Sequence, residues 1–258
     1  MKTYIANFRK YRFLLIELVK KGIKLKYRRS YLGILWTLIE PIMTTIVLSI
    51  VFGTLFGNPD PTFPVYILTG RLLYSFFSSA TNGAMKSIRT NSGMIKKVYV
   101  PKYIYPLSSV LFNFIIFAIS LIVLIGACII FKVYPTIYIF GVIIVLALLF
   151  LTAFGVGIIL ATMAVFFRDL EYLWSVALMI IMYASAIFYK VEKIMNSGYA
   201  FILKLNPVYL LIHNFRQAIY GHPLNMHYLC ASIVFAVCVT GVGLFFFYKK
   251  QDDFILYI

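Results

Sequence analysis

The chain has 258 residues, of which 62% are hydrophobic and only 12% are charged, and it carries a formal net charge of +16. Soluble domains average about half apolar and a quarter charged residues, so this composition excludes a soluble globular protein and indicates one that is solvated by a bilayer. The basic residues lie in short segments between apolar runs, as topology signals do, and this distribution argues against nucleic acid as a partner.

Residues 1–33 are predicted to form a cytosolic amphipathic segment at the membrane interface. At about 100° per residue, Tyr11, Leu15 and Leu18 fall on one stripe, while lysines and arginines occupy the opposite side. Basic amphipathic helices of this kind lie among anionic lipid headgroups. A cytosolic helix packed against a partner is the alternative. No signal peptide is expected, because the first long apolar run begins near Ile34, after ten basic residues.

Residues 34–258 are predicted to form an all-α integral membrane domain with six transmembrane helices. A span needs about 20 predominantly apolar residues. The runs that fit are 34–57, 64–83, 104–131, 137–165, 173–189 and 228–248. Arg71 and several serines dilute the second run, and the fifth run is short. Six spans place both termini on the same side of the membrane.

The distribution of Lys and Arg predicts which side that is. With the N-terminus inside, the inner segments carry eighteen of these residues and the outer segments carry five, with Arg71 inside a span. Cytoplasmic loops are enriched in Lys and Arg, so this bias predicts that the N- and C-termini are cytosolic.

The external segment 190–227 is too long for a simple turn. It contains two short amphipathic pieces that are separated at Asn206-Pro207, where proline permits a helix to begin but not to continue through. Apolar residues such as Leu210 and Phe215 fit short external helices that dip back into the outer leaflet before the last span. A helical cap that lies flat on the outer surface fits equally well.

Enzymatic and cofactor motifs are not found. None of the fifteen glycines precedes a lysine, so the chain lacks a P-loop and is not expected to hydrolyse nucleotides. The histidines and the three cysteines lack the spacing of metal or redox sites, and the eight acids form no evident pair for acid–base chemistry. We therefore expect no catalytic, cofactor-binding or metal-binding residue in this chain.

Two ionisable residues within predicted spans point to an internal cavity. Glu40 lies ~9 Å above the inner face and Arg71 ~20 Å above it, and this difference in depth argues against a direct ion pair. Each is expected to face a cavity, because charges in a bilayer usually serve a function. Aromatic rings suit the apolar faces of sugars, although single phenylalanines more often face lipid. The candidates for lining a channel are Glu40, Arg71, Tyr74, Phe76, Phe77, Phe112, Tyr183 and Phe188.

Three motifs in order resemble the type-2 ABC exporter permeases of the polysaccharide export family, which handle O-antigen, capsule or teichoic acid on undecaprenyl diphosphate. The first runs from Tyr27 through Trp36 to Glu40-Pro41. The second is Phe167-Arg168-Asp169-Leu170, at the expected turn between spans four and five, and the third is Asn206-Pro207 followed by Phe215-Arg216. The resemblance covers essentially the whole chain.

The resemblance implies a homodimer in the bacterial cytoplasmic membrane, in contact with membrane lipids and a lipid-linked glycan, and two separate ATPase subunits that bind ATP and Mg²⁺. It also implies that the loop 84–102 carries a coupling helix for the ATPase, with Lys86, Arg89, Lys96 and Lys97 as the contacting cations. A headgroup entrance would comprise Tyr27, Arg28, Arg29, Tyr31, Gly33 and Trp36, since arginine suits a diphosphate. A pure topology role for Arg28 and Arg29 is the alternative.

Two other functions remain open on the sequence. A type-2 exporter of drugs or lipids would need a narrower and more apolar route. A membrane enzyme acting on polyprenyl-linked sugars would need clustered acids or histidines at one membrane face, and the scattered acids argue against it.

Overall fold

The structure is a computed structural model that describes residues 2–28, 30–56, 60–98, 100–191 and 200–257. Over these ranges the chain is helical and contains no β-strand, as predicted. Four segments in the described ranges are long and apolar enough to cross a membrane: Gly33–Leu55, Ile104–Ile130, Ile137–Phe166 and Met226–Lys250. They correspond to α2 (Trp36–Phe56), α5 (Ile104–Ile130), α6 (Gly141–Phe166) and α11 (Met226–Lys250), each of which agrees closely with a predicted run.

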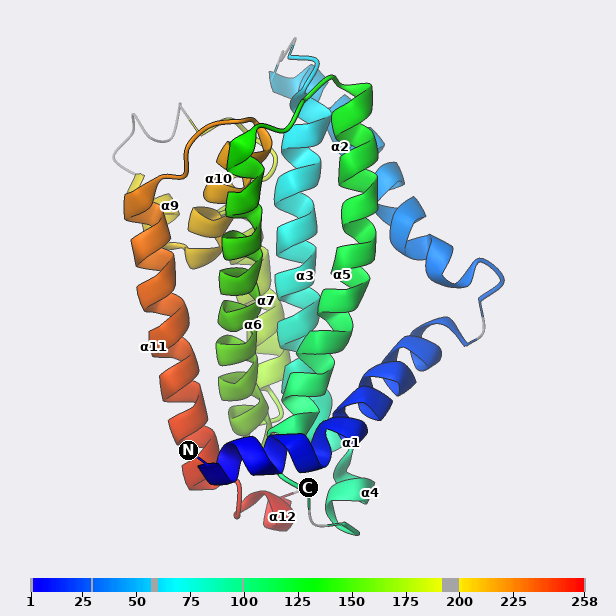
Figure 1. The fold of residues 1–258 in the computed structure, drawn as a ribbon, viewed down its shortest axis with the longest axis vertical. Helices are drawn as coiled ribbons and strands as arrows, with labels where there is room; N and C mark the ends of the chain where they lie inside the picture. Colours follow the sequence, from blue (N-terminus) through cyan, green and yellow to red (C-terminus); the bar gives the residue numbers. More distant parts are fainter. Residues whose placement is uncertain (1, 29, 57–59, 99, 192–199, 258) are drawn as a thin grey trace.

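Helix α3 (Phe63–Thr90) explains why the second predicted span carries so many polar residues. It lies in the middle of the bundle, against α2, α5, α6 and α10 (Figure 1). Polar side chains are tolerated there because they bond within the protein: the fully buried Thr81 hydroxyl donates to the Phe77 carbonyl at 2.8 Å. A Cβ at Gly157 of α6 would lie 2.7 Å from the Ala84 Cβ, so glycine permits the close approach of α6 to α3.

Helix α7 (Leu170–Tyr183) ends well before the predicted boundary at residue 189. Its 14 residues extend ~21 Å, less than a bilayer core of about 30 Å. The chain then turns, and Ala186 takes a φ of 49°, which no α-helix contains. The Tyr66 hydroxyl donates to the carbonyls of Ala186 and Tyr189 at 3.2 and 2.8 Å, so this buried turn is bonded to α3.

The N-terminal helix α1 (Lys2–Tyr27) crosses one end of the bundle (Figure 1). Leu15 and Leu18 are buried in a cluster with Ile104 and Tyr105 of α5. Short helices α4 (Ser92–Ile95) and α12 (Phe254–Tyr257) lie at the same end. The first and last described helices therefore share one end of the molecule.

Helices α9 (Ala200–Leu205) and α10 (Pro207–Ile219) lie at the opposite end and break at Asn206-Pro207, as predicted (Figure 1). Asn206 caps α10, because its Oδ1 accepts from the Val208 N–H at 3.0 Å. Its Nδ2 donates to the Ala184 carbonyl and the Ser185 hydroxyl at 3.1 and 2.9 Å. Helix α10 packs against α3, α6 and α11 with ten of its 13 residues buried, so it inserts into the bundle rather than lying flat on it.

Candidate functional site

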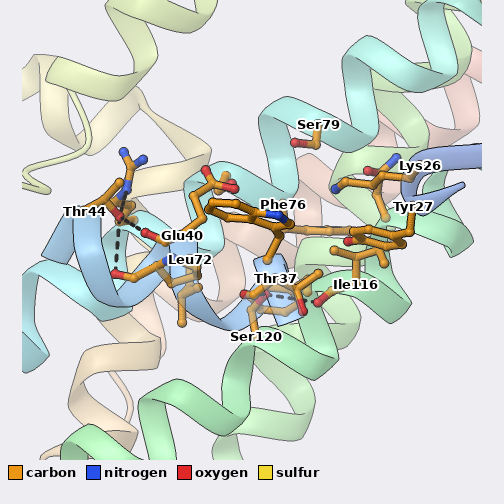
Figure 2. Close-up of a pocket in the computed structure, with 16 residues that line it drawn as sticks. Lys26, Tyr27, Thr37, Glu40, Thr44, Leu72, Phe76, Ser79, Ile116 and Ser120 are labelled. Atoms are coloured by element: carbon orange, nitrogen blue, oxygen red, sulfur yellow. Dashed lines mark hydrogen bonds between the residues drawn. The ribbon is translucent and has the colours of Figure 1, made fainter. Parts of the chain in front are cut away.

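A cavity of about 150 Å³ lies where the end of α1 meets α2, α3 and α5 (Figure 2). Its lining residues are Lys26, Tyr27, Trp36, Thr37, Glu40, Pro41, Thr44, Arg71, Leu72, Ser75, Phe76, Ser79, Asn113, Ile116, Phe117 and Ser120. The end of α1 and the start of α2 contribute aromatic and cationic side chains, whereas α3 and α5 contribute both polar and apolar ones.

Helical periodicity brings these polar side chains together. Side chains three, four or seven residues apart share one face of a helix. Three sets of lining residues have this spacing. They are Thr37, Glu40 and Thr44 on α2; Arg71, Ser75 and Ser79 on α3; and Asn113 and Ser120 on α5. Each helix thus turns one polar stripe inward, and the three stripes enclose the cavity.

Hydrogen bonds join the walls. The Arg71 Nε donates to the Thr44 hydroxyl at 3.0 Å, and that hydroxyl donates to the Glu40 carbonyl at 2.8 Å. From α5, the Ser120 hydroxyl lies 3.1 Å from the Thr37 carbonyl, to which it donates. Glu40 and Arg71 line the same cavity without forming an ion pair, which agrees with the difference in depth estimated from the sequence.

The cavity has an excess of positive charge, from Lys26 and Arg71 against Glu40. The Lys26 ammonium lies 5.8 Å from the Tyr27 ring centroid and 6.0 Å from that of Phe112, within range of cation–π attraction. Desolvation lowers the pKa of Lys26, and the Glu40 carboxylate opposes this shift. Desolvation, together with Glu40, raises the pKa of the Tyr27 hydroxyl. The arrangement suits a small anionic group next to aromatic rings.

The structure separates the predicted headgroup residues. Tyr27 and Trp36 line the cavity, whereas Arg28 faces a different groove on α1, lined also by Glu17, Lys20, Lys21, Lys24 and Leu25. Tyr31 is fully exposed, and Gly33 takes a φ of 50° in the turn between α1 and α2, where glycine is favoured. Arg29 lies outside the described residues.

The aromatic channel candidates also divide. Phe76 lines the cavity with Glu40 and Arg71. Phe77 and Phe188 are buried, as Phe76 is, but they do not line the cavity; they pack against Trp174 and Phe52 with ring centroids 6.3 and 5.0 Å apart. Phe77 and Phe188 therefore belong to the hydrophobic core of this chain.

Three more candidates lie next to the cavity or away from it. Phe112 lies beneath the Lys26 ammonium, just outside the lining. The Tyr74 hydroxyl donates to the Leu178 carbonyl at 2.8 Å and thereby joins α3 to α7. Tyr183 is 57% exposed at the end of α7.

Sequence reasoning missed several lining residues, chiefly Lys26, Thr44, Ser79 and Asn113. The serines of α3 had the spacing of a small-residue contact face, but Ser75 and Ser79 are exposed to the cavity rather than packed against a helix. The alignment of polar residues on three neighbouring helices was the available signal. Within the described ranges, no group of three or more His, Cys, Asp or Glu side chains could hold a metal ion.

Comparison with known proteins identifies the family. Residues 14–220, most of the chain, match the family described as ABC-2 type transporter. The chain belongs to the ABC-2 type transporter family.

Its relatives within the ABC-2 family include polysaccharide export permeases, as the sequence motifs suggested. The O-antigen export system permease protein RfbA of Klebsiella pneumoniae is 27% identical over 242 residues, which cover 93% of each chain. The protein of the same name from Myxococcus xanthus is 29% identical over 258 residues and 98% of each chain. The polysialic acid transport protein KpsM of Escherichia coli is 20% identical over 239 residues, covering 90% of this chain and 91% of KpsM.

In this ABC-2 chain, the residues predicted to contact an ATPase fall into two groups. Lys86 and Arg89 lie on the last turns of α3, and both bind the Glu171 carboxylate at the start of α7, at 3.1 and 2.7 Å. Lys96 and Lys97 follow α4 and are exposed. The first pair thus joins α3 to α7, while the second pair is accessible at the end of the bundle where α1 lies.

Proposed function

We propose that this chain is the transmembrane permease subunit of an ATP-driven exporter that moves undecaprenyl-diphosphate-linked polysaccharide or teichoic acid from the cytosol to the outer face of the bacterial cytoplasmic membrane. The family and the export permeases among its relatives support this proposal. The chain is not an enzyme by itself in this account. Two separate ATPase subunits bind ATP and Mg²⁺ and supply the energy.

The proposed topology has six spans, formed by α2, α3, α5, α6, α7 with its following turn, and α11. Both termini are cytosolic, which agrees with the Lys and Arg distribution and with the common location of α1 and α12 at one end of the bundle. Helices α9 and α10 then re-enter from the outer side, where the surrounding helices satisfy their backbone.

The cavity at the end of α1 is the observation on which the proposal chiefly depends. Its net positive charge, with Tyr27 and Trp36 beside Lys26, suits a diphosphate at the membrane interface. At about 150 Å³ it is smaller than the ~300–1,000 Å³ of most ligand sites, so it fits a headgroup and not a polymer. The glycan therefore needs a wider passage, which a homodimer provides between two copies.

The exposed Lys96 and Lys97 are the proposed contacts with the ATPase. A movement of the segment that carries Lys96 and Lys97 would pass through α3 to α7, because Glu171 of α7 binds both Lys86 and Arg89 of α3. The coupling loop and α7 would thus move together when the ATPase binds and releases ATP.

Site-specific photo-crosslinking tests the entrance. A photoreactive residue at Ser79, which lines the cavity, should capture the lipid-linked glycan at several times the yield of the same residue at Ser175 on α7, which is exposed away from the cavity. Lys26→Gln should lower the capture at Ser79 because it removes a cation. Equal capture at both positions, or preferential capture of a neutral lipid or drug, would overturn the proposal.

A further inference from the structure

A second pocket opens at the end of the bundle opposite α1. It has a volume of about 640 Å³, within the ~300–1,000 Å³ typical of small-molecule sites. The start of α3, the segment after α7 and helix α10 all contribute to it, and α10 together with the residues that follow it supplies six of the ten lining residues. The cavity described above lies elsewhere and shares no residue with this pocket.

The wall of this pocket holds a buried cation, Arg216, that forms no ion pair with a carboxylate of the described residues. Arg216 is 7% exposed, and its nitrogens donate to the carbonyls of Ala186 and Tyr66 at 2.9 and 3.0 Å and to the Thr69 hydroxyl at 3.4 Å. The guanidinium also lies 3.4 Å from the Tyr66 ring centroid. These contacts fix the guanidinium in place without neutralising it, since a carbonyl carries only a partial charge.

Among the described lining residues, the other charges of the pocket cancel. Lys190 pairs with Asp60 at 3.1 Å on the rim. Arg216 therefore leaves the pocket with an excess of one positive charge when the histidines are neutral. An anionic group on a ligand would compensate this charge in a partly buried site, where attraction is stronger than in water.

A buried hydroxyl in the same wall forms no hydrogen bond within the described part of the chain. Tyr209 is 1% exposed, and its hydroxyl oxygen is buried without a hydrogen bond to any described residue. The Tyr228 side chain interacts with it but does not reach hydrogen-bond geometry. More than about 90% of buried polar groups are bonded in proteins, so this hydroxyl is a group that a ligand in the pocket would satisfy.

The remaining lining supplies both polar and apolar contacts. Gln217 and His213, which lie one helical turn apart on α10, offer a donor and an acceptor, with their side-chain nitrogens 3.4 Å apart. The rings of Tyr209 and Tyr220 offer apolar surface beside them. Neighbouring hydroxyls on a sugar need such donors and acceptors, and the C–H faces of its ring suit aromatic neighbours.

We propose that this pocket is an external binding site for an acidic saccharide, in which Arg216 faces the anionic substituent and Tyr209, His213 and Gln217 bind hydroxyls. The inference deepens the proposed function, on which it rests for the orientation of the pocket and the source of the ligand. It assigns the exported glycan to the class that contains sugars with a carboxylate or phosphate substituent. An inorganic anion or a glycerophosphate headgroup would use the cation but not the rings.

Binding to the purified full-length chain in nanodiscs, measured by saturation-transfer NMR, tests the assignment. The probes are a disaccharide that contains glucuronic acid, its neutral glucose counterpart, inorganic phosphate and glycerol 1-phosphate. The acidic disaccharide should bind at least about tenfold more tightly than the other three probes. Equal binding of the neutral disaccharide, or tighter binding of either phosphate probe, would overturn the proposal, as would an absence of binding.

Tyr209→Phe and Tyr105→Phe provide a matched pair of variants. Both hydroxyls are buried without a hydrogen bond to a residue that the structure describes, but Tyr105 lies in the core near α1 and does not line the pocket. Removing either should not destabilise the fold, whereas Tyr209→Phe should weaken binding of the acidic disaccharide by about three- to tenfold. Equal affinity of the two variants would contradict the assignment. Because no ATPase or transport is involved, loss of the proposed export function would leave this result unchanged.

Discussion

Gly70→Ala should destabilise the protein through Arg216. A Cβ at Gly70 would lie 2.6 Å from the Arg216 Nη2 and 3.4 Å from the Ile187 Cα, so the guanidinium has to move. Arg216 is 7% exposed and is held by hydrogen bonds to Thr69, Ala186 and Tyr66, and the shift would break its 3.0 Å bond to the Tyr66 carbonyl. Overpacking costs about 1–3 kcal/mol, and a hydrogen bond from a charged group contributes about 1.5–3 kcal/mol. Alanine recovers up to about 1 kcal/mol of helix propensity.

The net expectation is a loss of about 2–4 kcal/mol in the free energy of unfolding, measured by SDS titration in mixed micelles. Gly126→Ala is the matched control, since a Cβ there meets no atom within 4 Å, and it should be neutral or stabilising. In an Arg216→Met background, Gly70→Ala should cost less than about 1 kcal/mol, as a double-mutant cycle would detect. If Gly70→Ala is as stable as Gly126→Ala, the assigned role of Arg216 at this contact is wrong.

Three other predictions concern separate parts of the fold. Asn206→Ala removes the α10 cap and leaves buried partners unbonded, so it should lower the unfolding free energy by about 2–4 kcal/mol in the same titration; a loss below about 0.5 kcal/mol would contradict the assigned role of this residue. Glu171→Gln removes ion pairs to Lys86 and Arg89 that are partly exposed, so stability should fall by no more than about 1–2 kcal/mol. ATP-driven transport should fall several-fold, with assembly intact by co-purification, and unchanged transport would refute the coupling role. Phe254→Ala should release α12, detected as faster hydrogen exchange of residues 251–257, because the Phe254 side chain is fully buried; unchanged exchange would show that this contact does not hold the helix.

Local signals in the sequence predicted much of the fold. Proline after Asn206 marks the break between α9 and α10, since its ring and missing N–H act on the residues beside it. The apolar runs of α2, α5, α6 and α11 are visible because lipid contact requires a continuous apolar surface. The early end of α7 was not predictable from hydropathy, because the turn that follows is itself apolar and depends on Tyr66 of α3.

Only part of the candidate site was predictable from the depth of its residues along their helices. Glu40 and Arg71 form no ion pair with each other, as the sequence indicated, but that they line one and the same cavity was not predicted. Which aromatic residue borders that cavity was not predictable, because Phe76 and Phe77 are adjacent on α3, both are buried, and only the neighbouring helices determine which of them lies against the cavity. The Glu171 ion pairs were also invisible, since they join residues that are far apart in the sequence.

The most direct test of the proposed export function is ATP-dependent delivery of a lipid-linked glycan across a membrane. The chain and its ATPase would be reconstituted in proteoliposomes with labelled undecaprenyl-diphosphate-linked glycan. We predict ATP-dependent transfer to the leaflet opposite the ATPase, and a severalfold loss of this transfer with Lys26→Gln while the complex stays assembled. Delivery without ATP, or full delivery by the Lys26→Gln variant, would contradict it.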